Sequence, residues 1–437
     1  MPIKLIRALT AALVGVAVGV AAGVVSVVAV AASPASAAWT AVRTLSPPNW
    51  SGQDQPTVAV DRQGDALLVW AGCDGSAGYC TDRVQVQRRT RAGALGPVRL
   101  VTPAGMSATW PKVAVDDDGD GALVWVHDSV ISAARVSAAG VPGPVQPVTT
   151  WSSTSPSIAV DRSGSALITW TESVRSVDVA KARRFGVDGT LGPELTLGPG
   201  GAGGPVAAFA DDGTALVVWT EGYERILSVR IAPDGTVSAP TEVAAPATEV
   251  RYGQPDLAVE GDGDAVLSYS VAPYEGYARR VVQRYHRNGT LEPAVVATPE
   301  THWLSYYSSI VVDRNGTATL VWGRWNWETD NSREVYLRRF PATGTPGPVT
   351  VLGRGDWPSV TLDDSGAGFV AWQYPGPMVQ ESQVHGVSLA ANGTPGAVQT
   401  VAPGGRSVAA AASVTGAVTV IWQKGTHPSA IQARFTR

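Results

Sequence analysis

The sequence is poor in cysteine, lysine and charge. Its 437 residues include 2 cysteines, and charged residues make up 16% of the chain. Two cysteines are too few to staple a chain of this length, so the fold must rest on a hydrophobic core. The formal net charge is −4, and the lysines are Lys4, Lys112, Lys181 and Lys424. Because no dense basic run occurs, we expect neither nucleic-acid binding nor an electrostatic membrane patch.

Familiar catalytic and cofactor motifs are also missing. The sequence contains no G-x-S-x-G, no H-E-x-x-H, no phosphate loop and no dinucleotide fingerprint. Its 5 histidines lie in different parts of the chain, without ligand spacing. We therefore expect no resident cofactor. The segment 116–121 (DDDGDG) starts like a calcium loop, but His127 stands where the closing glutamate belongs. Turn formation explains these residues, and a bound calcium ion is the alternative.

The N-terminus has the three parts of an export signal. Lys4 and Arg7 precede an uncharged Ala/Val/Gly stretch, which ends in Ala35-Ser36-Ala37. This pattern predicts a secretory signal peptide over residues 1–37. The stretch is also long enough to span a bilayer, so an uncleaved anchor is the alternative. We expect residues 38–437 to be secreted or attached to the cell envelope, as a monomer, with no other membrane segment.

The two cysteines lie close together in the sequence. Cys73 and Cys80 flank a glycine-rich segment. Outside the cytoplasm such a pair is typically oxidised, so we expect a local disulfide. A free redox pair is the alternative.

A unit of about 50 residues recurs eight times along the chain. Its pattern is P-x-V-A-V-D-x-x-G-x-A-L-V-V-W, and its last aromatic residue falls at Trp70, Trp125, Trp170, Trp219, Tyr269, Trp322, Trp372 and Trp422. A glycine precedes each of these residues by six positions, and an aspartate precedes five of them by nine. The two apolar runs predict strands, and the Asp-x-x-Gly between them predicts a turn. The repeated tryptophan is expected to pack between units as core.

Most units carry a second strand pair, so a full unit comprises four antiparallel strands. Tandem units of this kind are typical of a β-propeller. The eighth unit ends after its third strand, and residues 40–46 (TAVRTLS) read like the missing outer strand. We therefore predict an all-β fold, an eight-bladed β-propeller forming a single domain over residues 38–437. The N-terminal strand would close its ring. Seven blades plus a stray unit is the alternative.

Aromatic residues that the repeat does not explain are the candidate ligand site. Most of them fall in connections between blades, which a four-stranded meander places on one face around the central channel. Flat aromatic rings beside acids and arginine suit sugar rings, and protein partners use the same residue types. Packing as wedges between blades is the competing interpretation. The candidates are Trp50, Trp110, Trp151, Tyr252, Trp303, Trp325, Trp327 and Trp357.

The repeat, with its downstream G-x-x-G-P-V, resembles the tandem repeats of secreted actinobacterial β-propeller proteins, many labelled sialidase-like or WD40-like. That resemblance covers residues 39–437 and implies the fold and export, with no active-site motif. We predict a non-catalytic binding propeller that takes a glycan or an extracellular protein on its aromatic face. The alternative is a sialidase-like glycoside hydrolase or lyase that uses carboxylates at the channel mouth, at positions that the sequence does not identify.

Overall fold

The computed structural model describes residues 39–46, 51–73, 82–200, 204–245, 250–253, 255–273, 278–298, 307–326, 332–376, 381–425 and 429–436. The predicted signal segment lies outside these residues. Within the described part of the chain, no helix is long and apolar enough to cross a membrane.

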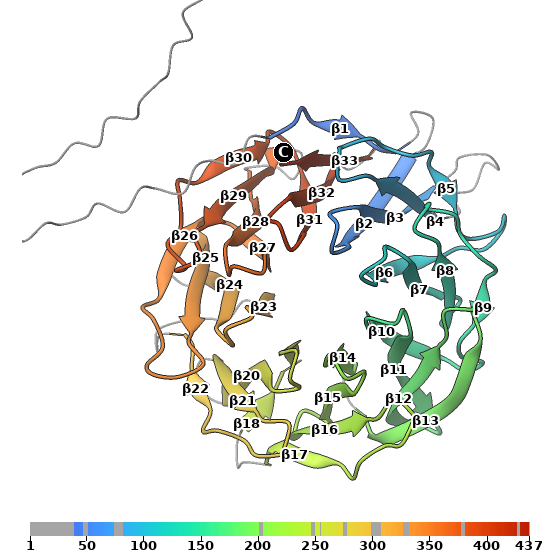
Figure 1. Cartoon of the computed structure of the whole chain (residues 1–437), viewed down its shortest axis with the longest axis vertical. Helices are drawn as coiled ribbons and strands as arrows, with labels where there is room; N and C mark the ends of the chain where they lie inside the picture. The colour runs from blue at the N-terminus through green and yellow to red at the C-terminus, as the bar shows by residue number, and fades with distance from the viewer. Residues whose placement is uncertain are drawn as a thin grey trace, which may run out of the picture. The chain divides into compact units, whose positions relative to one another are not determined.

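The described residues form eight antiparallel sheets arranged in a ring, which confirms the eight-bladed β-propeller (Figure 1). Blade 1 comprises β2 (Ser51–Val60), β3 (Ala66–Cys73), β4 (Asp82–Arg89) and β5 (Arg99–Leu100). Blade 2 comprises β6 (Thr109–Val115), β7 (Gly121–His127), β8 (Val130–Val136) and β9 (Gln146–Pro147). Blade 3 comprises β10 (Ser153–Val160), β11 (Ala166–Val174), β12 (Val177–Phe185) and β13 (Leu191–Pro199). Blade 4 comprises β14 (Val206–Phe209), β15 (Ala215–Glu221), β16 (Arg225–Ile231) and β17 (Thr241–Ala244).

Blade 5 has a first strand split in two, β18 (Val250–Tyr252) and β19 (Asp256–Val259), followed by β20 (Ala265–Pro273), β21 (Arg279–Tyr285) and β22 (Val295–Val296). Blade 6 comprises β23 (Ser308–Val312), β24 (Ala318–Asn326), β25 (Ser332–Phe340) and β26 (Thr350–Arg354). Blade 7 comprises β27 (Asp356–Leu362), β28 (Gly368–Tyr374), β29 (Gln383–Leu389) and β30 (Gln399–Ala402). Blade 8 comprises β31 (Arg406–Ala412), β32 (Val418–Lys424), β33 (Ala430–Phe435) and β1 (Arg43–Thr44).

The N-terminal strand closes the ring, as predicted. β1 pairs antiparallel with β33, so the blue and red ends of the chain share one sheet in Figure 1. The backbone N–H of Thr40 donates to the carbonyl of Phe435 at 2.8 Å, and that of Leu45 donates to Ile431 at 2.8 Å. The last blade thus takes its outer strand from the N-terminal end of the propeller, and this pairing closes the ring.

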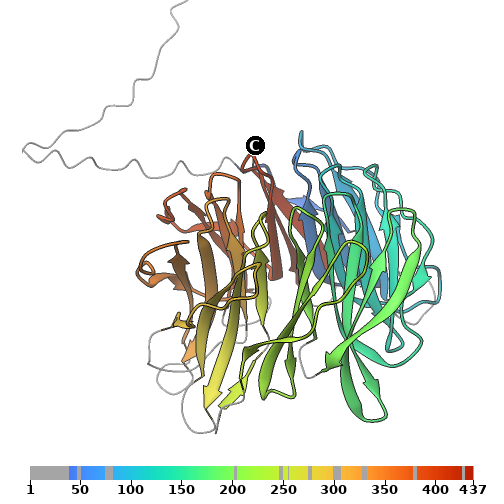
Figure 2. The same ribbon diagram turned by 60° about the horizontal axis from the view of Figure 1, so that its bottom comes forward.

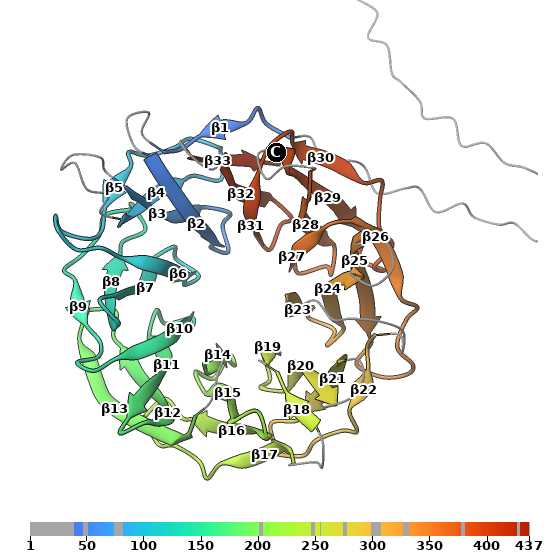
Figure 3. The same ribbon diagram turned by 180° about the vertical axis from the view of Figure 1, so that it is seen from behind.

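The first strands of the blades face the centre of the ring, and the fourth strands lie at its periphery (Figure 3). Neighbouring first strands touch all the way round, including β31 against β2. The tilted view in Figure 2 shows turns and connections at both ends of the blades. Any ligand that approaches the centre of the ring therefore meets the first strands and the turns at their ends.

The repeated residues serve the fold as predicted. The eight repeat glycines all have positive φ, from 72° to 97°. In the first of these turns, the Asp61 carboxylate accepts hydrogen bonds from the backbone N–H of Gly64 at 2.7 Å and of Asp65 at 2.9 Å. The repeat tryptophans are buried between blades, with Trp125 packed on Leu67 and Val84 of blade 1. Turn chemistry and the core thus account for the repeat, and function must lie elsewhere.

Candidate functional site

The first strands share a bulge near one end. At the residue six positions before the repeat aspartate, five non-glycine residues take positive φ, between 51° and 57°. The strand register shifts at each of these five places. The residues are Gln55, Trp110, Ser155, Trp357 and Ser407. A bulge of this kind bends the strand and re-aims a side chain.

Positive φ is costly for these residues, at about 1–2 kcal/mol each. Such strain persists only where surrounding contacts fix the backbone. One such contact links neighbouring bulges, because the backbone N–H of Trp110 donates to the side-chain oxygen of Gln55 in the previous blade. The bulges therefore present a row of side chains along the inner rim of the ring.

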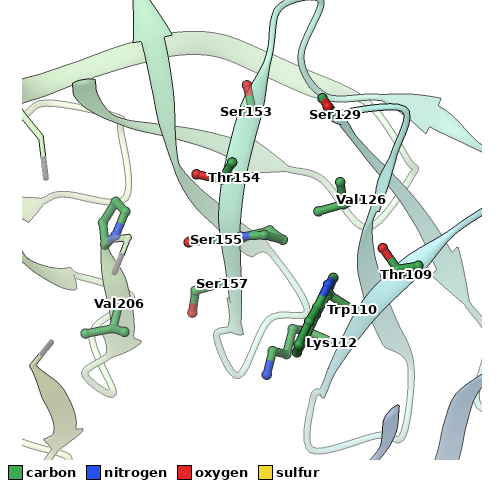
Figure 4. A pocket seen from close by; sticks show the side chains of 12 residues that line it. Thr109, Trp110, Lys112, Val126, Ser129, Ser153, Thr154, Ser155, Ser157 and Val206 are labelled. Atoms are coloured by element: carbon green, nitrogen blue, oxygen red, sulfur yellow. The ribbon is translucent and has the colours of Figure 1, made fainter. Parts of the chain in front are cut away.

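A pocket of about 560 Å³ opens where the first strands of blades 2, 3 and 4 meet. Figure 4 shows Trp110 and Lys112 extending from β6, the serines of β10 beside them, and Val206 on β14 beyond. The volume falls in the range of small-molecule sites. Its lining residues are Thr109, Trp110, Lys112, Val126, Ser129, Ser153, Thr154, Ser155, Pro156, Ser157, Pro205 and Val206.

The lining combines one aromatic plane with many hydroxyl groups. Trp110 is 61% exposed, which leaves most of its ring uncovered. Six lining residues are serine or threonine, and no lining residue is acidic. Hydroxyl groups can both donate and accept hydrogen bonds. The pocket is thus able to bind a ligand that has one apolar face and several hydroxyls.

Lys112 is the only charged residue in the lining. Its side chain remains accessible to solvent, yet desolvation by the surrounding walls lowers the pKa of its ammonium group. No hydrogen bond, ion pair or cation–π contact joins Lys112 to another residue in the described part of the chain. Its ammonium group is therefore available to a ligand.

A glycine keeps blades 3 and 4 close together beside the pocket. Gly204 precedes β14 and has a φ of +71°. A Cβ at this position would lie 2.6 Å from both the Cβ and the carbonyl oxygen of Ser155. Only glycine allows this approach without displacing Ser155, which lines the pocket.

A second aromatic cluster joins blades 6 and 7. The rings of Tyr307 and Trp357 stack with centroids 3.5 Å apart and an interplanar angle of 22°. The Arg333 guanidinium lies 4.9 Å from the centre of the Trp325 ring and 3.2 Å from the Asp356 carboxylate. Tyr307, Trp325 and Trp357 are each 40–42% exposed. This cluster presents a second aromatic surface, separate from the residues that line the pocket.

The structure separates the predicted aromatic residues. Trp110 and Trp357 lie within the first strands of their blades rather than in the connections, and Trp110 alone lines the pocket. Trp151 is 70% exposed in the connection before β10, and Trp325 lies in β24. Tyr252 is buried, donates its hydroxyl to the Ala245 carbonyl at 2.9 Å and packs edge-on against Tyr269, as a wedge would. Trp50, Trp303 and Trp327 lie outside the described residues.

Sequence reasoning overlooked most of the pocket. Lys112, the serines of β10 and Val206 were not among the candidates. A signal for them does exist, because a proline follows the bulge position in six blades, at Pro56, Pro111, Pro156, Pro205, Pro255 and Pro358. That recurrence marks the bulge position on six of the eight first strands.

Two aspartates of blade 1 interact with one another, Asp54 on β2 and Asp82 at the start of β4. Asp54 precedes the bulge residue Gln55, and its carboxylate accepts a hydrogen bond from the Gln55 N–H at 2.6 Å. Desolvation raises the pKa of Asp82, and the charge of Asp54 raises it further. The two carboxyl groups are therefore close enough to influence one another.

The candidate calcium turn is organised by the protein itself. The Asp116 carboxylate accepts hydrogen bonds from the N–H groups of Asp118 at 3.0 Å and Asp120 at 2.9 Å. Across the described residues, no group of three or more His, Cys, Asp or Glu could hold a metal ion. Cys73 is buried at the end of β3, and Cys80 lies outside the described residues, so their pairing remains a prediction.

No family model matches the sequence, and neither does any curated protein. Solved structures share its architecture. A lectin from Burkholderia pseudomallei matches with a TM-score of 0.55 and 11% identity, over 80% of this chain and 99% of the lectin. An ulvan lyase, a polysaccharide lyase bound to -[GlcA(1-4)Rha3S]-, matches with a TM-score of 0.51 and 10% identity, over 89% and 95% of the two chains. The Dos1 propeller matches at 0.53 and 9%, over 90% and 94%. At these identities the likeness establishes the propeller fold and leaves the function to the residues of the site.

Proposed function

We propose that this protein is a secreted, monomeric propeller that binds a saccharide in the pocket beside Trp110. One observation carries the proposal: a pocket of about 560 Å³ combines a largely exposed tryptophan ring with six hydroxyl side chains. The C–H face of a sugar ring packs on an aromatic plane, while its hydroxyls exchange hydrogen bonds with serine and threonine. A lectin and a polysaccharide lyase among the structurally similar propellers support the same class of ligand.

Export belongs to the same proposal. The N-terminal segment would direct the chain out of the cytoplasm. In the oxidising environment outside, Cys73 and Cys80 would form a disulfide. Secretion is tested by N-terminal sequencing of protein from the culture medium. A mature chain beginning at Ala38 would support cleavage after residue 37, and a membrane-bound chain starting at Met1 would contradict it.

The binding site is tested by a matched pair of tryptophan variants. A glycan array is probed with the wild type, with Trp110→Ala and with Trp151→Ala. Trp151 is the control because it is 70% exposed and does not line the pocket. Trp110→Ala should weaken binding by about tenfold or more, as is usual when an aromatic anchor is removed, while Trp151→Ala should bind like the wild type.

Both variants should have the same urea unfolding midpoint as the wild type, because both rings are mostly exposed. Wild-type protein that binds no saccharide would contradict the proposal. Equal loss of binding in both variants would also count against it, since the pocket would then have no special role.

A glycoside hydrolase or lyase is the second candidate, and the Asp54–Asp82 pair is the observation that favours it. A carboxyl group whose pKa is raised by burial and by a second carboxyl group nearby is an arrangement used in acid catalysis. The test is to incubate the bound glycan with wild-type protein and with Asp82→Asn and to follow new reducing ends and unsaturated products. Cleavage by the wild type that the variant lacks would establish an enzyme, whereas an intact glycan in both reactions would favour binding alone.

A further inference from the structure

Lys112 differs from its counterparts in the other blades. It lies four residues before the repeat aspartate, on the first strand of blade 2. The residues at the same position in the other blades are Thr57, Ser157, Val206, Asp256, Ser309, Ser359 and Ala409. None of them carries a positive charge.

Two of these counterparts join neighbouring blades by accepting hydrogen bonds. The Asp256 carboxylate accepts from the backbone N–H of Ile310 at 3.0 Å, and the Ser359 hydroxyl accepts from Ala410 at 3.3 Å. A lysine ammonium group has three donors and no acceptor, so Lys112 cannot make this contact. Lys112 therefore does not form the hydrogen bond that Asp256 and Ser359 form between blades.

The surroundings of Lys112 favour an anion. The ammonium group is partly desolvated, and no acidic residue lines the pocket to compensate its charge. A desolvated charge without a counter-charge is unfavourable, and an anionic ligand would remove that penalty. Because the whole protein is negatively charged, its long-range field would not attract such a ligand, and the recognition would be local.

We propose that the pocket selects saccharides that carry an anionic group, a carboxylate or a sulfate, held by the Lys112 ammonium group. This inference rests on the proposed saccharide binding and adds the class of ligand. The Trp110 ring would pack on the C–H face of the anionic sugar, and the serines of β10 would bind the hydroxyls of that sugar.

The test uses paired saccharides that differ in charge alone. An array carries uronic-acid oligosaccharides beside their carboxyl-reduced forms, and sulfated oligosaccharides beside their desulfated forms. Wild-type protein should bind the anionic member of one pair at least about tenfold more tightly, because a charge-assisted hydrogen bond is strong. The pair that responds identifies which anion is taken.

Three variants assign the preference to Lys112. Lys112→Gln should bind both members of the pair equally, and Lys112→Arg should retain the preference because it keeps the charge. Lys424→Gln is the control, since Lys424 is exposed at the end of β32 and lies outside the pocket, and it should behave like the wild type.

The outcomes separate the two proposals. Equal wild-type binding of anionic and neutral members, unaffected by Lys112→Gln, would overturn the anionic preference and leave saccharide binding intact. A preference lost equally in Lys112→Gln and Lys424→Gln would also overturn it, because net charge would then be the cause. No binding of any saccharide would overturn both proposals.

Discussion

Lys112 on β6 and Asp256 on β19 occupy the same position in their strands but differ in what they contact. Each stands four residues before its repeat turn residue, Asp116 or Glu260. Lys112 faces a pocket without a protein partner among the described residues. Asp256 accepts two backbone hydrogen bonds, from its neighbour Leu257 and from Ile310 in the next blade.

Asp256 is half-buried, and the protein around it desolvates its carboxyl group. Desolvation raises the pKa of Asp256 to about 6, against the opposing effect of the Arg280 charge. Arg280 is 4% exposed and donates to the hydroxyl and the carbonyl of Ser268. Its own pKa falls to about 10 because burial disfavours the charged form.

The comparison teaches that the propeller uses one strand position for two purposes. An acceptor side chain there ties a blade to the next through its backbone, as Asp256 and Ser359 do. A lysine side chain cannot make that tie, and under the proposal above Lys112 would bind a ligand instead. Substitutions at Asp256 and at Lys112 should therefore differ in their effects on stability and on binding.

The largest expected effect is on stability, at Asp256. Asp256→Ala leaves the buried Arg280 charge without compensation and the Ile310 N–H without its acceptor, so the free energy of unfolding should fall by about 3 kcal/mol. Urea unfolding of the full propeller measures this change. Ser359→Ala is the matched control at the same strand position, and it should cost about 1 kcal/mol because it removes one neutral hydrogen bond. An unfolding midpoint of Asp256→Ala equal to that of the wild type would contradict the stabilising role of Asp256.

The Asp256 contribution also depends on pH. Because its pKa is raised in the folded state, the folded protein holds a proton between pH about 4 and about 6 that the unfolded chain has released. This carboxyl group therefore contributes less stability as pH rises through that window. Asparagine does not titrate, so the free energy of unfolding of Asp256→Asn should rise relative to that of the wild type as the pH increases from 4 to 6.5. A constant difference between the two proteins would show that the carboxyl group titrates as it does in the unfolded chain.

The fold could be predicted from the sequence because the same turn and strand residues recur at the same positions in every blade. Gly64 and its seven counterparts mark the same turn, and Trp70 and its counterparts mark the same buried strand. The incomplete eighth unit even indicated how the ring closes. Each of these signals is local, and local signals are what a sequence records directly.

The pocket could not be predicted in the same way, because it depends on contacts between blades. Trp110 and Tyr252 fall in corresponding segments, yet Trp110 is 61% exposed and Tyr252 is 8% exposed. Tyr252 is covered by Tyr269 of its own blade and by apolar residues of blade 4, whereas Trp110 borders the pocket. Likewise, Lys112 and Ser155 share a pocket only because two bulged strands converge, and the proline after each bulge marks its position without showing which side chains meet.

A smaller effect is expected from the strained bulge on the pocket side. Trp110 has a φ of 57°, which alanine tolerates poorly and glycine adopts freely. Trp110→Gly should therefore be more stable than Trp110→Ala by about 1 kcal/mol. The same pair of substitutions at Val351, which is exposed in β26 and is not among the residues with positive φ, should give the reverse order. Equal stability of the two Trp110 variants in urea would mean that the bulge stores no strain.

The smallest expected effect, at Lys112, is the sharpest check on the comparison. Lys112→Gln removes a desolvated charge that has no partner among the described residues, so the free energy of unfolding at pH 7 should rise slightly, by no more than about 0.5 kcal/mol. Because the folded pKa of Lys112 is lowered, the unfolded chain keeps a proton that the folded protein releases at alkaline pH. Wild-type stability should accordingly recover relative to the variant as pH rises towards the unfolded pKa of about 10.4.

Lys181→Gln is the matched control for this last prediction. The Lys181 ammonium group lies 2.6 Å from the Glu172 carboxylate, and Glu172 is 3% exposed. Replacing Lys181 by glutamine removes the positive charge beside the buried Glu172 carboxylate, so the free energy of unfolding should fall by about 3 kcal/mol. If Lys112→Gln instead cost more than about 1 kcal/mol, Lys112 would be stabilising the fold as Lys181 does. The ammonium group would then serve the protein, and the division between ligand-facing donor and blade-joining acceptor would fail.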